Sequence, residues 1–374
     1  MRVRTVLLAL VLVLAGCGGG AKPHPVVIGA VEDAAKSGDA PAKMKLAQRA
    51  GFKAIALSSV WKPPLEAPEP DELEALRTAV TAAKAAGIRP VVAVYSFAAD
   101  TPVTPEARAQ FAAYAASIPR ELPAVRDVVV GNEPNLNLFW MPQFGDDGSD
   151  AAATAYLELL AASYDALKAV SPAVNVIGGG LSARGSDRPG GTRPTHSPTK
   201  FIEDLGKAYR ASGRAEPVMD MFSLHPYPED SSIPPDFEHP KSTAIGLADY
   251  DKLVGLLGDA FDGTAQPGSS LPIVYGEYGL QTEIPPAEQG AYTGEEQPTT
   301  KAIDEQTQAD AYVQAIRMVK CEQTVELLLF FHVTDEPQLD RLQTGIYYAD
   351  DAPKASLEPV AKAAREAEAG KGGC

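Results

Sequence analysis

Apolar and polar positions alternate in blocks along the chain. Short apolar runs rich in β-branched residues predict buried strands, and the stretches between them carry apolar residues at helical spacing. The predicted strands cover residues 26–29, 53–60, 88–95, 128–131, 175–181, 219–227, 271–279 and 325–333. Helical stretches follow at 42–50, 71–87, from 104 onward, 151–170, 198–211, 247–261, 304–321 and 354–369.

Local signals mark where several of these helices begin and end. Asp71 with Glu74 forms a capping-box pattern, and Gly87 ends the same helix. Thr104 and Ser197 each precede a proline, which favours an N-cap followed by proline at the first helical position. No linker is evident in the middle of the chain, and the longer loops after strands four to seven, especially 180–197 and 279–302, should shape any pocket.

Eight strand–helix units in one chain predict an α/β protein, a single (β/α)8 TIM barrel over residues 26–369. The strands are nearly continuous apolar runs, which is typical of parallel strands covered on both faces. An open doubly wound sheet is the alternative, but "IGAVEDAA" lacks the glycine fingerprint that such folds carry after their first strand. The run Gly178–Gly180 falls inside a strand and predicts close backbone approach.

The N-terminal residues predict export. Arg2 and Arg4 precede an apolar run from Val6 to Ala15, which is shorter than the about 20 residues that span a bilayer and is typical of a signal peptide. The Leu-Ala-Gly-Cys sequence that follows resembles the lipobox of bacterial lipoproteins, which implies lipidation of Cys17 and attachment to the outer face of the cytoplasmic membrane. A plain secretory peptide with an incidental Cys17 is the alternative. These signals divide the chain into a signal peptide (1–16), a tether (17–25), the barrel (26–369) and a tail (370–374).

The charge balance limits the classes of partner. The formal charge of the whole chain is −16, and removal of Arg2 and Arg4 with the signal peptide would make it −18. A surface this acidic disfavours nucleic acid and anionic lipid headgroups. We therefore expect no nucleic-acid partner, and contact with the membrane through the lipid anchor alone.

The other two cysteines are Cys321 and Cys374. In an oxidising compartment a disulfide between them is expected. Two free thiols remain the alternative, because Cys374 ends a glycine-rich tail. The five histidines are scattered and form no Cys/His cluster with metal-ligand spacing. We expect no metal and no cofactor.

Two carboxylates stand at the ends of predicted strands. "VVVGNEPN" ends the fourth strand with Glu133, and "LPIVYGEYG" ends the seventh with Glu277. Active sites of (β/α)8 barrels lie at the C-terminal ends of the strands, so both side chains should point into one mouth. A facing pair suits glycoside hydrolysis, with one carboxyl as acid and the other as nucleophile or base. For either glutamate alone, an ordinary loop carboxylate is the alternative.

The segments "GNEPN" and "VYGEYG" resemble the acid/base and nucleophile segments of clan A retaining glycoside hydrolases, TIM-barrel enzymes with glutamates on strands four and seven. The resemblance implies Glu133 as acid/base, Glu277 as nucleophile and Asn132 as a contact of the sugar 2-hydroxyl. "SLHPYP" matches the His and Tyr that often follow strand six in this family, which implies site roles for His225 and Tyr227, the tyrosine holding the nucleophile. A buried core histidine is the alternative for His225.

The chain departs from the family pattern at two strand ends. Where many relatives carry Trp after strand eight, "FFHVTDEP" offers Phe331 and His332, and "SSVWKPP" lacks an Arg common near the end of strand two. Trp61 and Trp140 follow strands two and four, so they are candidate platforms for sugar rings, with packing at the barrel rim as the alternative.

These observations predict a monomeric retaining glycosidase that acts on an extracellular or cell-surface carbohydrate. Its mechanism requires Glu133 to be protonated and Glu277 ionised before attack, so we expect a raised pKa for Glu133. A catalytically inactive, lipid-anchored TIM-barrel receptor for a glycan or a protein is the alternative function.

Overall fold

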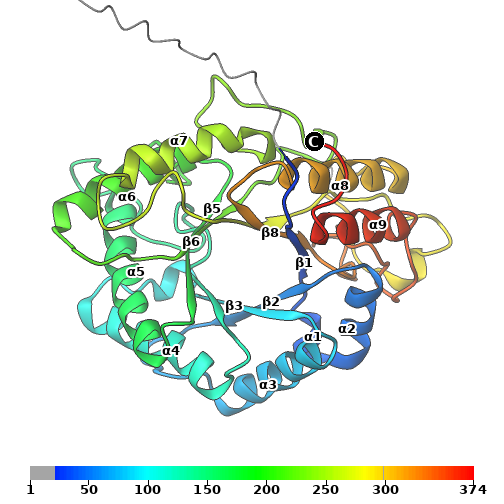
Figure 1. Ribbon diagram of the computed structural model, residues 1–374, viewed down its shortest axis with the longest axis horizontal. Helices are drawn as coiled ribbons and strands as arrows, with labels where there is room; N and C mark the ends of the chain where they lie inside the picture. Colours follow the sequence, from blue (N-terminus) through cyan, green and yellow to red (C-terminus); the bar gives the residue numbers. More distant parts are fainter. Residues whose placement is uncertain (1–21, 298) are drawn as a thin grey trace, which may run out of the picture.

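Parallel strands close into a barrel in the order of the sequence, and helices surround it (Figure 1). The structure is a computed structural model that describes residues 22–297 and 299–374. In these residues the barrel has eight strands, and pairs such as Val27 with Leu327 join the first strand to the last. The predicted (β/α)8 fold is confirmed. The strands are β1 (Val27–Val31), β2 (Ala54–Val60), β3 (Arg89–Tyr95), β4 (Asp127–Val130), β5 (Asn175–Ser182), β6 (Met221–His225), β7 (Ile273–Tyr278) and β8 (Val325–Phe331).

Helices connect the strands and form the outer layer (Figure 1). They are α1 (Ala34–Ser37), α2 (Ala40–Arg49), α3 (Pro70–Ala85), α4 (Pro105–Glu121), α5 (Ala151–Val170), α6 (Pro198–Ser212), α7 (Tyr250–Phe261), α8 (Glu305–Val319) and α9 (Leu357–Glu368). Short 3₁₀ turns lie at η1 (Ala98–Asp100), η2 (Leu247–Asp249) and η3 (Gln289–Ala291).

Two of the predicted helix starts are confirmed, and one is wrong. Thr104 accepts a hydrogen bond from the Ala107 amide, and Ser197 caps α6 in the same way. The capping box at Asp71 does not form, because α3 begins at Pro70, where proline is pre-organised for the first helical position. Asp71 lies instead in the first turn, where its negative charge suits the helix dipole.

Apolar side chains form two layers, one inside the barrel and one between the barrel and its helices. Side chains alternate across each strand, so Leu327 and Leu329 of β8 fill the interior while Leu328 packs outward. A Cβ on Gly179 of β5 would lie 2.6 Å from the Ser223 carbonyl oxygen of β6. The close backbone approach predicted for this glycine run is thus present, and the register shifts there, between Gly179 and Leu181.

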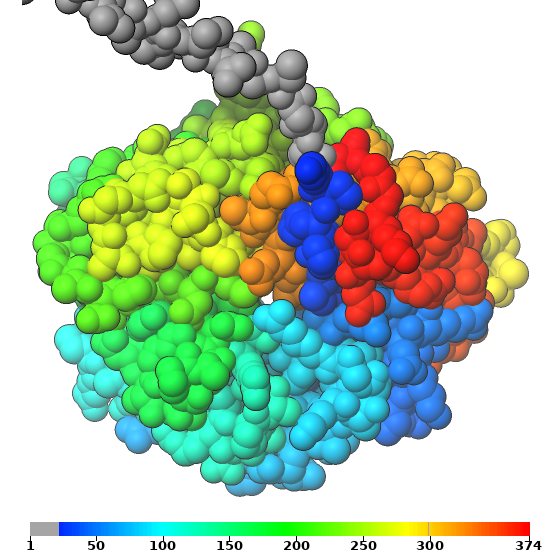
Figure 2. Space-filling model, in the orientation of Figure 1, coloured from blue at the N-terminus to red at the C-terminus, as the bar shows by residue number. Residues whose placement is uncertain are grey.

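The start of the described chain lies beside its C-terminal segment (Figure 2). The Val26 amide donates to the Ala367 carbonyl of α9, and His24 Nε2 lies 2.9 Å from the Glu322 carbonyl oxygen. Residues 22–25 of the predicted tether therefore contact the barrel, and Cys17 lies outside the described residues.

The C-terminal tail is also held against the barrel. Cys321 and Cys374 form a disulfide with their Cα atoms 5.6 Å apart. The Lys320 ammonium donates to the Lys371 carbonyl oxygen 2.9 Å away. Among the described residues, no helix combines the length and apolar character needed to cross a membrane.

Candidate active site

Glu133 stands just beyond β4 on backbone that few residues adopt. Its φ is +39°, a region that is uncommon for a residue with a side chain. The Glu133 amide donates to the Gly180 carbonyl oxygen 2.8 Å away, which ties this turn to the glycine-rich end of β5. Such local strain is retained where the surrounding structure fixes it, and it is concentrated at functional sites.

Glu277 lies within the last residues of β7 and follows Gly276, whose missing side chain leaves room for His225 of β6. A Cβ on Gly276 would lie 2.6 Å from Ser223 Oγ and 3.0 Å from His225 Nε2. Any larger residue at 276 would push the imidazole away, so this glycine lets β6 bring His225 close to β7. The two predicted glutamates and the predicted histidine thereby meet at one end of the barrel.

His225 lies between the two glutamates. Its Nδ1 is 3.3 Å from Glu133 Oε1 and 3.7 Å from Glu277 Oε2. Because both distances start from one nitrogen, these two carboxylate oxygens are at most about 7.0 Å apart. Carboxyl groups about 5–5.5 Å apart are typical of retaining glycosidases, whereas inverting enzymes use about 6.5–9.5 Å. This limit applies to one oxygen of each carboxylate, and the carboxyl separation of a retaining pair is compatible with it.

Tyr227 holds the other side of Glu277. Its hydroxyl donates to Glu277 Oε2 at 3.1 Å. Burial and the charges of Glu277 and Glu133 raise the pKa of Tyr227 well above its usual value, so it stays a donor at any ordinary pH. The hydrogen bond predicted for this tyrosine from the family resemblance is therefore present in the structure.

Burial raises the pKa of Glu277 to about 7, and the charge of Glu133 adds to that rise. His225 and the Tyr227 hydrogen bond act in the opposite direction. Near neutral pH Glu277, the group expected to ionise readily, is therefore protonated in a substantial fraction of molecules.

The pKa of His225 responds to its two carboxylate neighbours. Burial lowers it, but the charge of Glu277 and the hydrogen bond and charge of Glu133 together raise it above its usual value. Positive charge between the glutamates stabilises their ionised forms. His225 is thus a buried histidine whose contacts are the two glutamates, and it is part of the site's electrostatics.

The glutamates line a pocket of about 340 Å³. Asn132 and His332, both predicted site residues, also line it. His332 is nearly buried, and burial lowers its pKa, so its imidazole is neutral at pH 7. Its Nδ1 is buried and has no hydrogen-bond partner among the described residues.

The two tryptophans are not platforms in this pocket. Trp61 is 0% exposed, donates to the Leu65 carbonyl oxygen and packs edge-on against Phe111. Trp140 is also buried and packs against Tyr156. Both tryptophans therefore pack beneath the loops at the barrel rim, which was the alternative interpretation. The prediction of sugar platforms was wrong because a position after a strand does not fix the direction of a side chain.

The exposed aromatic surface comes from residues that the sequence analysis did not select. Phe97, which is 44% exposed, stacks on Phe139 with ring centroids 5.6 Å apart, and both contact Tyr95 edge-on. All three line the pocket that contains the two glutamates. Asp33 and Arg341 line it as well. The signal that could have found Asp33, Tyr95 and Phe97 is their position within two residues of the C-terminal end of a strand.

No metal centre is evident in the described residues. They contain no group of three or more His, Cys, Asp or Glu side chains placed to hold a metal ion. The site's chemistry is that of two carboxyls, an imidazole, a phenol and an aromatic wall.

Comparison with known proteins gives similarity in structure alone. No family model and no curated protein matches the chain. Solved structures that match include a family 39 glycoside hydrolase from Bacteroides cellulosilyticus WH2, at 20% identity over 91% of this chain with a TM-score of 0.63. This chain covers 63% of that protein's length.

Two further structures match over a similar extent. A glucosidase from Croceicoccus marinus is 15% identical over 93% of this chain and 68% of its own, with a TM-score of 0.61. An exo-β-1,4-mannosidase from an Opitutaceae bacterium is 16% identical over 92% of this chain and 60% of its own, with a TM-score of 0.56. At these identities the comparison establishes the fold alone, a (β/α)8 barrel that this chain shares with these structures.

Proposed function

We propose that this protein is a retaining glycoside hydrolase that uses Glu277 as nucleophile and Glu133 as acid/base. The observation that carries the proposal is the placement of both carboxyls around His225, with their oxygens at most about 7.0 Å apart, in a pocket at the C-terminal ends of the strands. The neighbouring solved structures include enzymes named as a mannosidase, a xylosidase and a glucosidase, which supports the same reaction class.

In the first step the Glu277 carboxylate attacks the anomeric carbon while Glu133 gives its proton to the glycosidic oxygen. The sugar is then joined to Glu277 as an ester, and the leaving alcohol departs. In the second step the Glu133 carboxylate takes a proton from water, whose oxygen attacks the anomeric carbon and releases Glu277. One proton on the glutamate pair is the stoichiometry that this sequence needs, and substrate binding must place it on Glu133.

The neighbours of the pair have matching tasks. The Tyr227 hydrogen bond orients Glu277 and favours its ionised form. Phe97 and Phe139 offer apolar faces to the C–H surfaces of a sugar ring, and Asn132 and His332 offer polar atoms. This division between an apolar wall and a few polar groups is common in ligand pockets.

The test is the stereochemistry of the product. Purified protein is incubated with aryl glycosides and polysaccharides, and the anomeric configuration of the first product is followed by NMR. Retention with wild type, loss of turnover in Glu277→Ala, and full activity in Glu74→Ala on the outer face of α3 are the expected results. An inverted product, or an active Glu277→Ala, would overturn the proposal, and binding of glycans without any turnover would indicate a receptor.

We also propose that the enzyme is exported and anchored through a lipid on Cys17, facing outward from the cytoplasmic membrane. The support is the short apolar run and the Leu-Ala-Gly-Cys sequence. Cys17→Ser should release the protein from the membrane fraction or leave it unprocessed. Unchanged detergent partitioning of that variant would contradict the anchor.

A further inference from the structure

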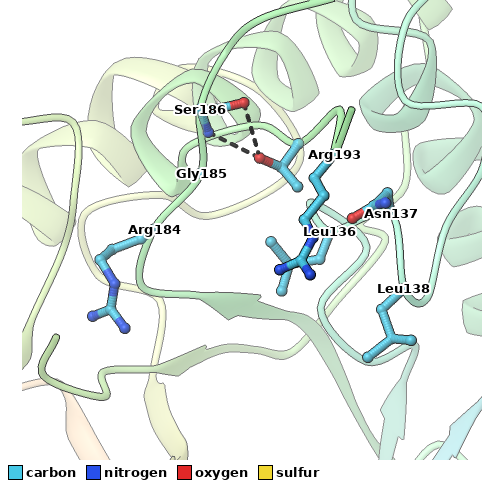
Figure 3. A pocket seen from close by; sticks show the side chains of 8 residues that line it. Leu136, Asn137, Leu138, Arg184, Gly185, Ser186 and Arg193 are labelled. Carbon is cyan, nitrogen blue, oxygen red and sulfur yellow. Dashed lines mark hydrogen bonds between the residues drawn. The ribbon is translucent and has the colours of Figure 1, made fainter. Parts of the chain in front are cut away.

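A second hollow adjoins the catalytic pocket. Its volume is about 770 Å³, and it lies between the loop after β4 and the loop after β5. Leu138, which is 59% exposed, lines both this hollow and the catalytic pocket, so the two meet at this side chain. Figure 3 shows Arg184 and Arg193 of the β5 loop in this hollow, with Asn137 and Leu138 across from Arg184.

The charge of this hollow is opposite to that of the chain. The whole chain has 49 acidic and 33 basic residues, yet two arginines and no Asp or Glu line the hollow. Asp187 is near in sequence, but its Oδ1 accepts from the Ser197 amide at 2.7 Å and is engaged in capping the loop. The described residues place no carboxylate in an ion pair with Arg184 or Arg193, in contrast to Arg214, which pairs with Asp165.

The structure holds the Arg184 side chain in place, whereas Arg193 is exposed on a closed backbone turn. Arg184 is partly buried, and its Nη1 donates to the Tyr227 carbonyl oxygen at 2.7 Å. That contact fixes its guanidinium beside the residue that orients Glu277. The turn that carries Arg193 is closed by bonds from the Ser186 and Asp187 amides to Thr195, drawn in part in Figure 3. Among the described residues, the Arg184 guanidinium makes no other hydrogen bond and the Arg193 guanidinium makes none. Their other N–H groups are therefore available to a ligand.

We propose that this hollow is a subsite for an anionic sugar unit, one that carries a carboxylate or a sulfate, next to the bond that is cleaved. Guanidinium groups bind such anions through paired, charge-assisted hydrogen bonds. Leu136 and Leu138 supply apolar surface for the sugar ring, and Arg341 adds positive charge on the wall of the catalytic pocket. This proposal deepens the proposed function and rests on it for the position of the scissile bond.

The test measures binding separately from turnover. Glu277→Ala protein is titrated with matched oligosaccharides: xylo-oligosaccharides with and without a glucuronate branch, and oligogalacturonates with free or methyl-esterified carboxylates. Chondroitin with and without sulfate distinguishes a carboxylate subsite from one that needs sulfate. Arg184→Gln and Arg193→Gln are each added to this background, and Arg188→Gln serves as the control because Arg188 is exposed on the same loop and does not line the hollow.

We expect at least one acidic oligosaccharide to bind about tenfold more tightly than its neutral counterpart, as a charge-assisted hydrogen bond provides. Arg184→Gln and Arg193→Gln should each remove most of that preference, Arg188→Gln should retain it, and added salt should weaken it. Thermal melting of each variant checks that the fold is intact. Equal affinity for both members of every pair, binding to no acidic member, or an equal loss in Arg188→Gln would overturn the proposal.

The same experiment separates this inference from the proposed function. If wild-type protein hydrolyses aryl glycosides through Glu277 but shows no preference for acidic oligosaccharides, only the anionic subsite is rejected. If acidic oligosaccharides bind through Arg184 and Arg193 but wild-type protein hydrolyses neither them nor any aryl glycoside, the anion-binding hollow stands and the proposed hydrolase activity is rejected.

Discussion

The hydroxyl of Tyr227 donates a hydrogen bond to Oε2 of Glu277 at 3.1 Å, across the ends of adjacent strands β6 and β7. The two residues are 50 positions apart in the sequence. Their contact links the proposed nucleophile to the loop after β6. The Tyr227 carbonyl oxygen in that loop also accepts a hydrogen bond from Arg184. The position and the ionisation of Glu277 should therefore both depend on Tyr227.

Tyr227→Phe should lower kcat and move the acidic limb of the pH profile to higher pH. The hydrogen bond from Tyr227 lowers the pKa of Glu277, so its loss raises that pKa and leaves less nucleophile ionised at neutral pH. Loss of one hydrogen bond to a charged group should cost about tenfold in rate. The measurement is kcat/KM from pH 5 to 9. An unshifted limb would show that Tyr227 does not tune Glu277.

Glu277→Gln should stabilise the protein at alkaline pH. The folded pKa of about 7 lies above the usual carboxyl value, so the folded state binds more protons than the unfolded state between about pH 4.5 and pH 7. The free energy of unfolding therefore falls as pH rises through this window. Because the side chain is 21% exposed, replacing the charge should recover about 1–3 kcal/mol at pH 8.

Melting temperatures of wild type and Glu277→Gln at pH 4.5 and pH 8 provide the check. The difference between the two proteins should be small at pH 4.5, where Glu277 of wild type is protonated in the folded state and about half protonated in the unfolded state. A difference that is equal at both pH values would mean that ionisation of Glu277 carries no cost in the folded protein.

Glu133→Ala should separate the two steps of the proposed reaction. Aryl glycosides with good leaving groups need little help from an acid, so the first step should proceed, while the second step stalls for lack of a base. Azide needs no deprotonation to attack, and it should restore turnover and yield a glycosyl azide. The readout is steady-state rate with and without azide, and product identity by mass spectrometry. Absence of rescue would argue against Glu133 as the acid/base.

Opening the disulfide should destabilise the barrel at the junction of α8, β8 and the tail. Cys321 and Cys374 are 53 positions apart, and a closed loop of that length stabilises by about 4 kcal/mol in the chain-entropy model. Cys374→Ser should therefore lower the melting temperature, and reductant should lower that of wild type alone. Alkylation without reductant, read by intact mass, checks the bond directly. Two alkylated thiols in native protein would show that it does not form.

The repeating order of apolar runs and amphipathic stretches was sufficient to predict the barrel. Eight strand–helix units leave few ways to cover both faces of parallel strands, and Thr104 and Ser197 marked two helix starts through local hydrogen bonds. The capping-box pattern at Asp71 competed with a second local signal, the proline at position 70. Pro70 decided the start of the helix, so the predicted capping box did not form.

The sequence by itself determined which carboxyls lie at strand ends, because strand order and the barrel rule place Glu133 and Glu277 at the same mouth. Only the tertiary structure decided which aromatic residues face that mouth: Trp61 turns into the core, and Phe97 turns outward. It also decided the pKa of Glu277, since burial and the approach of His225 past Gly276 depend on contacts between neighbouring strands. Periodicity records which positions are covered, whereas the direction of a loop side chain and the charges around it arise from residues distant in the sequence.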